Sequence, residues 1–471
     1  MALSRLSPLD ASFLAVETPT AHMHVGWASI FDPPAGESRP SFAELREHIG
    51  RRLPRAPRYR QMLRSVPLGL NAPVWVDDPE FDVSRHVVRA DSSSLTEVVN
   101  GCMSEPLPRD RPLWQVRIAP RLDDGRIAVV GKAHHCMVDG IAAVELASLL
   151  VDPERNAPDP EPDHWSPQPG PDNAQLVSSA VLDFARDQLD LVSLPARLAR
   201  SPQRAVSLLG RAGRAAGALL DAARPAVLDP ALNPPISPDR HLGFLARPLD
   251  ELLSIKEEFG VKLNDAVLAV SAGAVRRFLA ERGEKPPALK TMVPVNVREH
   301  NGDGTLGNRI SFMFVDLPCD EPDPVRRLRL VHEATSQRKR SGIPEGADAV
   351  LGAMKLAPTP IRGVVSRFVA SPRTFNLVVS NIPGPREPLY MRGCPLVEAY
   401  PVVPLADRHA LAIGMTTVRD GAFFGLYADR EMLPDVDELA SYLDSSVDEL
   451  LDLSASVPGR GDPVASLSPP G

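Results

Sequence analysis

A proline-rich segment lies about one third of the way along the 471-residue chain. Seven prolines occur there among acidic side chains: Pro153, Pro158, Pro160, Pro162, Pro167, Pro169 and Pro171. Proline has no backbone N–H and fixes an extended backbone, so such a stretch resists both helix and sheet. We therefore expect residues 152–173 to be a linker between two domains, each long enough to bury its own core.

Strand-like and helix-like patterns alternate on both sides of this linker. The predicted strands are 24–31, 115–118, 126–133, 289–298, 310–316 and 375–381, with a hairpin over 409–427. The predicted helices are 41–49, 94–102, 249–259, 266–279, 324–337 and 436–453. Hairpins together with alternating elements favour α/β or α+β domains with mixed sheets. The expected division is an N-terminal lobe over 1–151, a crossover over 152–232, a C-terminal lobe over 233–455 and a disordered tail over 456–471.

Composition excludes several classes of protein. The net charge of -8 argues against a general nucleic-acid binder, which needs a basic surface. No apolar run approaches the ~20 residues that cross a bilayer, and the N-terminus has no signal-peptide pattern. The four cysteines are far apart, so neither a zinc site nor a disulfide framework is indicated: they are Cys102, Cys136, Cys319 and Cys394. A reducing cytoplasm is the expected location.

The crossover is rich in alanine, leucine and arginine. We expect helices over 174–228, broken at Pro195, Pro202 and Pro225. Between Arg197 and Arg224 arginine predominates, inside an acidic protein. A basic amphipathic helix can lie on an anionic membrane surface, and a solvated helix pair between the domains is the alternative.

The heptapeptide His134–Gly140 follows the predicted strand 126–133 and carries the clearest chemistry. Neighbouring side chains on a strand point to opposite faces, which disfavours a metal chelate of the two histidines. One imidazole can face a cavity, where it is well suited to accept a proton near neutral pH. Asp139 can orient that ring or pair with an arginine, and Gly140 lets the chain turn. A buried, hydrogen-bonded histidine pair is the alternative. The chain has no G-x-S-x-G, P-loop or G-x-G-x-x-G motif.

Several motifs in one order resemble the bacterial wax ester synthase/acyl-CoA:diacylglycerol acyltransferase family. HHxxxDG at 134–140 is shared with chloramphenicol acetyltransferases and condensation domains. The more specific motifs are Pro112–Trp114, Ser380–Pro385, Leu6–Asp10 and Met23–Gly26. The resemblance covers nearly the whole chain.

The resemblance implies two chloramphenicol-acetyltransferase-like lobes with the active site in a tunnel between them. It implies transfer of a fatty acyl group from acyl-CoA, a co-substrate, to diacylglycerol, with no cofactor and no metal. A fatty alcohol, another acceptor, or an inactive lipid-binding role are the alternatives. The partners implied are the lipid substrates and a membrane or lipid-droplet surface at which the protein binds peripherally.

The resemblance also assigns roles to residues. His135 is the expected general base, His134 packs inward, and Asp139 is expected to pair with Arg298 beside Gly140. Asn264 is a substrate-binding candidate or a helix N-cap. Ser380 and Asn381 either line the tunnel or shape the Pro-Gly-Pro turn, and Trp114 is expected in the core. The chain departs from the family pattern at Arg408, Ala412 and Val418, where the family usually has Gly, Asn and Tyr.

Overall fold

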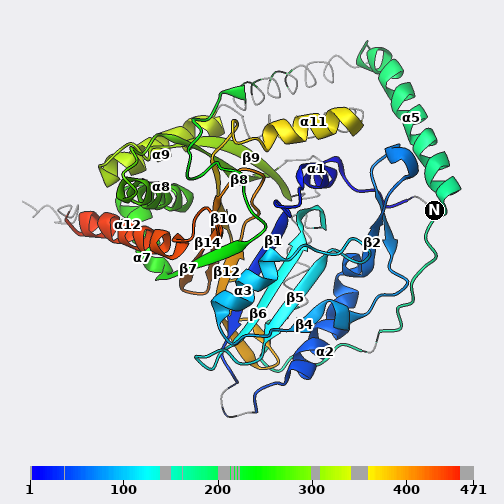
Figure 1. Ribbon diagram of the computed structural model, residues 1–471, viewed down its shortest axis with the longest axis horizontal. Helices are drawn as coiled ribbons and strands as arrows, with labels where there is room; N and C mark the ends of the chain where they lie inside the picture. Colours follow the sequence, from blue (N-terminus) through cyan, green and yellow to red (C-terminus); the bar gives the residue numbers. More distant parts are fainter. Residues whose placement is uncertain are drawn as a thin grey trace, which may run out of the picture.

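The computed structural model describes residues 3–34, 36, 38–137, 150–161, 163–199, 210, 213, 217, 220, 223–298, 308–340 and 359–456. Two six-stranded mixed sheets form the two lobes (Figure 1). In the N-terminal sheet only β4 and β5 run parallel. Its strands, in order, are β11 (Tyr390–Met391), β12 (Cys394–Val402), β1 (His24–Phe31), β6 (Ile127–His134), β5 (Trp114–Ala119) and β4 (Val87–Arg89).

In the C-terminal sheet β10 runs parallel to both of its neighbours, and the other pairs are antiparallel. Its strands, in order, are β7 (Arg240–Pro248), β14 (Gly421–Asp429), β13 (Leu411–Val418), β10 (Leu377–Ile382), β8 (Leu289–Arg298) and β9 (Asn308–Leu317). A separate antiparallel pair joins β2 (Gln61–Arg64) and β3 (Val74–Asp77). The mixed sheets confirm the predicted fold class.

Four helices of the C-terminal lobe, α7, α8, α9 and α12, gather on one side of its sheet, whereas α11 lies beside α1 of the N-terminal lobe (Figure 1). The C-terminal helices are α7 (Leu249–Glu258), α8 (Leu263–Glu281), α9 (Pro324–Arg340), α11 (Thr359–Val369) and α12 (Val436–Ser456). The N-terminal helices are α1 (Pro8–Val16), α2 (Phe42–Arg52) and α3 (Leu95–Ser104). Single 3-10 turns are η1 (Leu53–Arg55), η2 (Pro57–Arg60), η3 (Pro67–Gly69), η4 (Val83–Arg85) and η5 (His135–Met137).

Local sequence explains two of these elements directly. The side chain of Ser41 accepts from the backbone N–H of Glu44, and the Glu44 carboxylate accepts from the backbone N–H of Ser41, so α2 begins with a capping box. In α8 all residues from Asp265 to Val275 are buried, which fits a helix that is apolar around most of its circumference and enclosed by other elements.

Strand β12 connects the two lobes. It belongs to the C-terminal half of the chain, yet it pairs with β1 in the N-terminal sheet, where Gly26 lies opposite Val402. It also lies so close to the C-terminal sheet that a Cβ on Gly425 would be 2.1 Å from the carbonyl oxygen of Pro401. Any side chain at position 425 would collide with the Pro401 carbonyl oxygen, so glycine is required there. The lobe boundaries proposed from the sequence stay a prediction.

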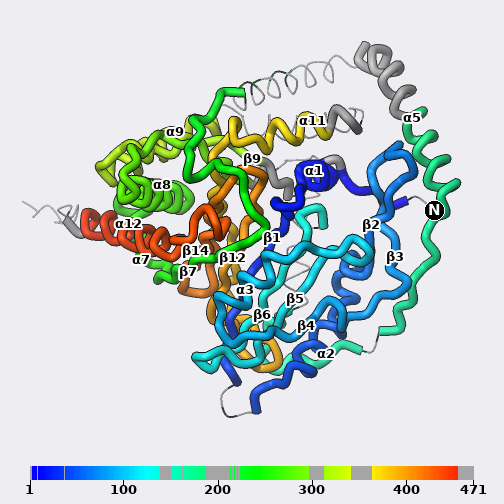
Figure 2. Tube along the Cα trace, in the orientation of Figure 1, coloured from blue at the N-terminus to red at the C-terminus, as the bar shows by residue number. Residues whose placement is uncertain are grey.

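The proline-rich segment runs into a helix that is longer than the sequence suggests. Apart from one bridge at Asp152, the described residues of 152–172 form neither helix nor strand. Figure 2 shows this segment following the outer margin of the N-terminal lobe to α5 (Asn173–Ala199). The predicted break at Pro195 is wrong, because α5 continues through it. A proline removes one helical hydrogen bond without obliging the helix to end. Most of the stretch Arg197–Arg224 lies outside the described residues.

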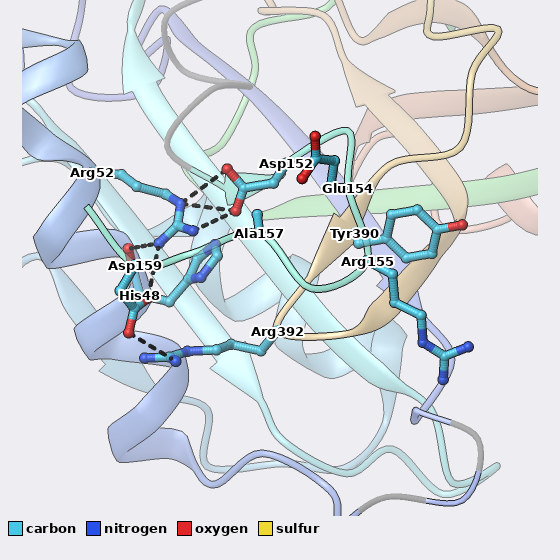
Figure 3. Close-up of a pocket in the computed structure, with 9 residues that line it drawn as sticks. All are labelled: His48, Arg52, Asp152, Glu154, Arg155, Ala157, Asp159, Tyr390 and Arg392. Atoms are coloured by element: carbon cyan, nitrogen blue, oxygen red, sulfur yellow. Dashed lines mark hydrogen bonds and ion pairs between the residues drawn. The ribbon is translucent and has the colours of Figure 1, made fainter.

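The start of the linker is held by a group of polar side chains, of which His48, Arg52 and Asp152 are buried. We call it the Arg52–Asp152 cluster: His48, Arg52, Asp152, Asp159 and Arg392 (Figure 3). The Arg52 guanidinium donates to the Asp152 carboxylate at 3.1 Å, and Arg392 donates to Asp159 at 3.1 Å. The backbone of Asp152 also pairs with that of Tyr390 in β11. The cavity between these side chains is about 20 Å³, room for about one water and no larger ligand.

Candidate active site

The two histidines lie where β6 ends and η5 begins. Strand β6 is buried along its whole length, which suits a strand covered on both faces. His134 lies opposite His24 of β1, and its backbone N–H donates to Leu113. The N–H of His135 donates to the carbonyl oxygen of Met23 at 2.9 Å. The two histidines are thus held between β1 and the segment that precedes β5.

Backbone strain occurs at this contact. Met23 has φ of +49°, a left-handed conformation that a residue with a side chain adopts at a cost of about 1–3 kcal/mol. Its carbonyl is the group that holds His135. Strain of this kind persists only where surrounding contacts impose it, and it is common at functional sites.

His134 has the character of a packing residue. Its side chain is 1% exposed, and its Nδ1 accepts the backbone N–H of Cys136 at 3.1 Å, which leaves the hydrogen on Nε2. That Nε2 is 3.7 Å from the Glu17 carboxylate, which is itself paired with Arg109. Burial, and then the Arg109 charge, lower the pKa of His134 to about 3. His134 is therefore neutral and held in place, while its role stays a prediction.

His135 has a different environment. Its ring stacks on Phe13 of α1, with the ring centroids 3.7 Å apart and the planes 16° from parallel. Burial lowers the pKa of His135 to about 4. A neutral imidazole can accept a proton, so the ring is in the reactive protonation state at neutral pH. The low pKa makes it a weaker base than a solvated histidine, but one that is always available.

Two further histidines enclose this region. His22 and His24 are buried, with ring centroids 5.2 Å apart, and burial lowers the pKa of both. Their Nδ1 atoms and the Nε2 of His134 are buried without a hydrogen-bond partner. Within the described part of the chain no group of three or more His, Cys, Asp or Glu side chains could hold a metal.

Comparison with known proteins identifies the family. The model of the wax ester synthase/diacylglycerol acyltransferase catalytic domain matches residues 6–267, and that of the WS/DGAT C-terminal domain matches residues 306–451. The chain belongs to the wax ester synthase/diacylglycerol acyltransferase family. It is 31% identical over 464 residues to a probable diacylglycerol O-acyltransferase of Mycobacterium tuberculosis, covering 96% of each chain. It is 29% identical over 473 residues to a second one from that organism, covering 94% of this chain and 98% of the other.

Solved structures share the two-lobed fold. The wax ester synthase/diacylglycerol acyltransferase from Marinobacter aquaeolei VT8 superposes with a TM-score of 0.68 at 24% identity, covering 96% of this chain and 100% of the other. A starter condensation domain of rhizomide synthetase, in complex with C8-CoA, superposes with a TM-score of 0.55 at 14% identity, covering 97% and 95%. This protein is thus an acyltransferase of the WS/DGAT type.

Part of the predicted acyltransferase site lies outside the described residues. Asp139 and Gly140 are not among them, and the side chain of Arg298, the last residue of β8, is not described either. The ion pair between Asp139 and Arg298 therefore stays a prediction. Trp114 is a core residue as expected: it is 2% exposed and its indole N–H donates to the Tyr59 carbonyl at 2.8 Å.

The remaining candidates lie in the C-terminal lobe. Asn264 is half-buried in the first turn of α8, but Lys262 is the N-cap, so the N-cap interpretation of Asn264 is wrong. Ser380 is buried and Asn381 is half-buried near the end of β10. No hydrogen bond joins His135 to these three residues within the part of the chain that the structure describes. Their role in substrate binding stays a prediction.

The Pro-Gly-Pro turn and one departure from the family pattern have a structural explanation. A Cβ on Gly384 would lie 1.7 Å from the Thr417 carbonyl oxygen, so only glycine fits where this turn meets β13. Arg408 has φ of +60°, the left-handed region that glycine, the usual family residue, adopts without strain. Ala412 and Val418 are buried in β13.

The sequence did not reveal several residues around His135. Phe13 stacks on His135, Glu17 lies 3.7 Å from His134, and Arg109 pairs with Glu17, although all three are far from the histidines in the chain. The one available signal was the N-terminal motif Leu6–Asp10, which marked this segment as part of the family pattern without giving its position.

Proposed function

We propose that the protein transfers a fatty acyl group from acyl-CoA to the hydroxyl group of diacylglycerol, with His135 as general base. The observation that carries the proposal is the neutral imidazole of His135, enclosed against Phe13 at the end of β6. The family assignment supports acyl transfer, and relatives about 30% identical are named probable diacylglycerol O-acyltransferases.

The reaction needs a stronger nucleophile and no covalent enzyme intermediate. His135 takes the hydroxyl proton as the acceptor oxygen attacks the thioester carbonyl carbon. The tetrahedral intermediate then collapses, the C–S bond breaks, and the CoA thiolate takes the proton back from His135. The products are triacylglycerol and CoA, and the base is regenerated. A positioned general base of this kind contributes ~10²–10⁴-fold, and holding both substrates in place adds to it.

The half-buried position of His135 also suits this chemistry. Water near the thioester would compete with the acceptor hydroxyl and hydrolyse the acyl-CoA. The stacked Phe13 ring covers one face of the imidazole and excludes water from it. Asp139 and Arg298 are proposed to hold the loop that follows, while Asn264, Ser380 and Asn381 contact substrate from the other lobe.

The acceptor is tested with purified protein and labelled palmitoyl-CoA, offered with diacylglycerol, hexadecanol or no acceptor. We expect labelled triacylglycerol from the wild type and almost none from His135→Gln. If the wild type forms more hexadecyl palmitate than triacylglycerol, the protein is a wax ester synthase instead. If the wild type acylates neither alcohol, the proposed reaction is wrong.

A lipid acceptor must be reached at a lipid surface. No helix in the described part of the chain is long and apolar enough to span a bilayer. Helix α5 leaves Val181, Leu182 and Phe184 between 56% and 63% exposed. Beside it, Leu68 of the neighbouring η3 is 94% exposed. We propose that this apolar face, with the arginines of 197–224, docks on anionic membranes or lipid droplets.

Vesicle co-sedimentation tests the docking face. Leu68→Ser with Phe184→Ser is expected to reduce binding to phosphatidylglycerol vesicles, because less apolar surface enters the lipid. Charge reversal of the arginines between 197 and 224 tests the electrostatic part. If both sets of variants bind the vesicles as well as the wild type does, this face is not the docking surface.

A further inference from the structure

A basic cavity lies in the C-terminal lobe, away from the histidines. It is open to the surface and has a volume of about 370 Å³, and it is lined by half-buried Ser336 and by three exposed side chains, Lys262, Lys339 and Arg340. Lys262 immediately precedes α8, and the other three residues are in the last two turns of α9. Three cationic side chains therefore converge on one cavity of a chain whose net charge is -8.

The antiparallel packing of α8 and α9 places this cavity at a defined end of the lobe. Near the start of α8, Asp265 is bonded to His332 and Thr335 in the second half of α9, each at 2.7 Å. Near the end of α8, Arg276 instead donates to the Cys319 carbonyl at 3.1 Å, just before α9 begins. The start of α8 and the end of α9 thus lie together.

This end of the lobe is also where the substrate-binding candidates lie. The end of α8 contacts Cys319, which follows the end of β9, and the end of β9 pairs with the start of β8. The cavity is at the other end of α8. It therefore lies toward the opposite end of the sheet, where β8 finishes. Strand β10 runs parallel to β8 and finishes toward the same end with Ser380 and Asn381. Asn264 lies two residues beyond Lys262 in the chain. The cavity and the three candidates therefore share one end of the C-terminal lobe.

The nearest carboxylate offsets only part of the positive charge of the cavity, because Asp265 raises the pKa of Lys339 by less than burial and Lys262 lower it. Asp265 is fully buried, and both of its oxygens accept hydrogen bonds from α9 side chains. Among the described residues no ion pair involves Lys262, Lys339 or Arg340. Burial, and then the charge of Lys262, lower the pKa of Lys339, as expected for two ammonium groups held near each other. An anion in the cavity would relieve this repulsion.

We propose that this basic cavity binds the phosphate groups of the CoA moiety of the acyl-CoA donor. The inference rests on the proposed function, which requires acyl-CoA. Arginine and lysine with a serine hydroxyl form a donor set suited to phosphate oxygens. CoA carries its phosphates at the end opposite the thioester, joined by a long flexible arm. The charged end is thereby held at the surface of the C-terminal lobe while the thioester extends to His135.

Comparing two acyl donors tests the assignment. Lys339→Gln with Arg340→Gln removes two charges, and palmitoyl-CoA is compared with palmitoyl-N-acetylcysteamine, a thioester without phosphates. We expect kcat/KM for palmitoyl-CoA to fall by about tenfold or more, mainly through KM, because charge-assisted hydrogen bonds are lost. The value for the phosphate-free thioester should not change. Equal losses with both donors, or no loss with palmitoyl-CoA, would overturn the assignment.

Lys285→Gln with Arg329→Gln is the matched control. Both residues are exposed; Lys285 follows the far end of α8 and Arg329 lies in the first half of α9, so the same number of charges is removed away from the cavity. We expect this control to retain the wild-type kcat/KM with palmitoyl-CoA. A loss equal to that of the cavity variant would show a general effect of net charge and contradict a local site.

Direct binding separates this assignment from the proposed reaction. Calorimetric titration with adenosine 3′,5′-bisphosphate needs no turnover, so it reports on the cavity even if the wild type proves inactive with diacylglycerol. We expect the cavity variant to bind it about tenfold more weakly than the control. If the variant instead keeps nucleotide affinity but loses binding to phosphatidylglycerol vesicles, the cavity recognises lipid headgroups and the CoA assignment is wrong.

Discussion

The histidine end of β6 and the Arg52–Asp152 cluster both lie largely inside the protein, and both join segments far apart in the chain. They differ in how their charged groups are paired, although the cluster also has two buried atoms without a hydrogen-bond partner, Nδ1 of His48 and Nε of Arg392. In the cluster, Arg52 pairs with Asp152, and Arg392 pairs with Asp159 (Figure 3). Around the histidines, Nε2 of His134 and Nδ1 of both His22 and His24 have no hydrogen-bond partner.

This difference separates a structural site from a chemical one. A buried polar atom without a partner costs about 1–3 kcal/mol, so several of them in one place need a reason. Paired charges around a cavity of about 20 Å³ leave no room for a substrate. We infer that the Arg52–Asp152 cluster fixes the linker to the lobes, and that the histidine end is kept unpaired for a reacting molecule.

The largest expected effect is on catalysis at the histidine end. His135→Gln should lower kcat/KM by about 10²–10⁴-fold, because the general base is lost, while the free energy of unfolding changes by less than about 1 kcal/mol. Acyl transfer and urea unfolding measure the two quantities. His86→Gln is the control, since His86 is also buried and has a lowered pKa, but its Nδ1 contacts the Trp114 carbonyl. Similar activity losses in both variants would remove the distinction between catalytic and packing histidines.

The opposite result is expected in the Arg52–Asp152 cluster. Although burial alone would raise it, hydrogen bonds from Arg52 and Arg55 lower the pKa of Asp152, so the carboxylate is charged at neutral pH. Asp152→Asn removes the nearer of the two counter-charges of Arg52, which is 1% exposed, and leaves only Asp159 at 3.7 Å, so it should cost about 3–5 kcal/mol of unfolding free energy. Urea unfolding measures this loss, and kcat of the folded protein should stay near wild type.

The matched control for that variant is Asp124→Asn, which breaks an ion pair with Arg126 in which the Asp124 side chain is 47% exposed. It should cost no more than about 1 kcal/mol. If Asp152→Asn is no more destabilising than this surface variant, the cluster does not fix the linker.

A smaller effect is expected at Phe13. Phe13→Ala removes the ring that stacks on His135 and should lower kcat/KM by about tenfold or less. Because the active form of His135 is neutral and its pKa is about 4, wild-type kcat/KM should fall only as the pH drops toward 4. Water admitted in the variant should move this acidic limb up toward pH 6.5. Phe81→Ala, which removes a stack on His86, should leave the limb in place.

The sequence predicted most elements but missed the strand that connects the lobes. Strand β12 contains Pro395 and Pro401, and proline in a run argues against an internal strand. Pro401 is tolerated because β11 pairs only with Cys394 and Pro395, so in the described part of the chain that edge of β12 has no partner strand at Pro401. Such tolerance depends on tertiary structure, which local patterns do not reveal.

The same reasoning explains what could be predicted about the site. His134 and His135 were identifiable because a strand ending in two histidines is a local pattern, and its alternation predicted unequal roles. The contacts of His135 with Phe13 and of His134 with Glu17 depend on how α1 packs against η5, and no periodicity in the chain encodes that packing. The pKa values of the two histidines follow from burial and were equally inaccessible.

The last expected effect appears only on acidification and concerns the pH dependence of stability at His48 in the Arg52–Asp152 cluster. Burial, and then the Arg52 charge, lower the pKa of His48 to about 4. In the unfolded chain histidine binds its proton near pH 6.5. Between these values only the unfolded state is protonated, so unfolding free energy should fall with decreasing pH by about 1.4 kcal/mol per unit from this residue. His48→Gln keeps an N–H for the Leu150 carbonyl and should remove that part of the slope, measured by urea unfolding from pH 6.5 to 4.5. The control is His164→Gln in the linker, where the histidine is exposed. If His48→Gln changes the slope of unfolding free energy against pH no more than this control does, the cluster accommodates a charged His48.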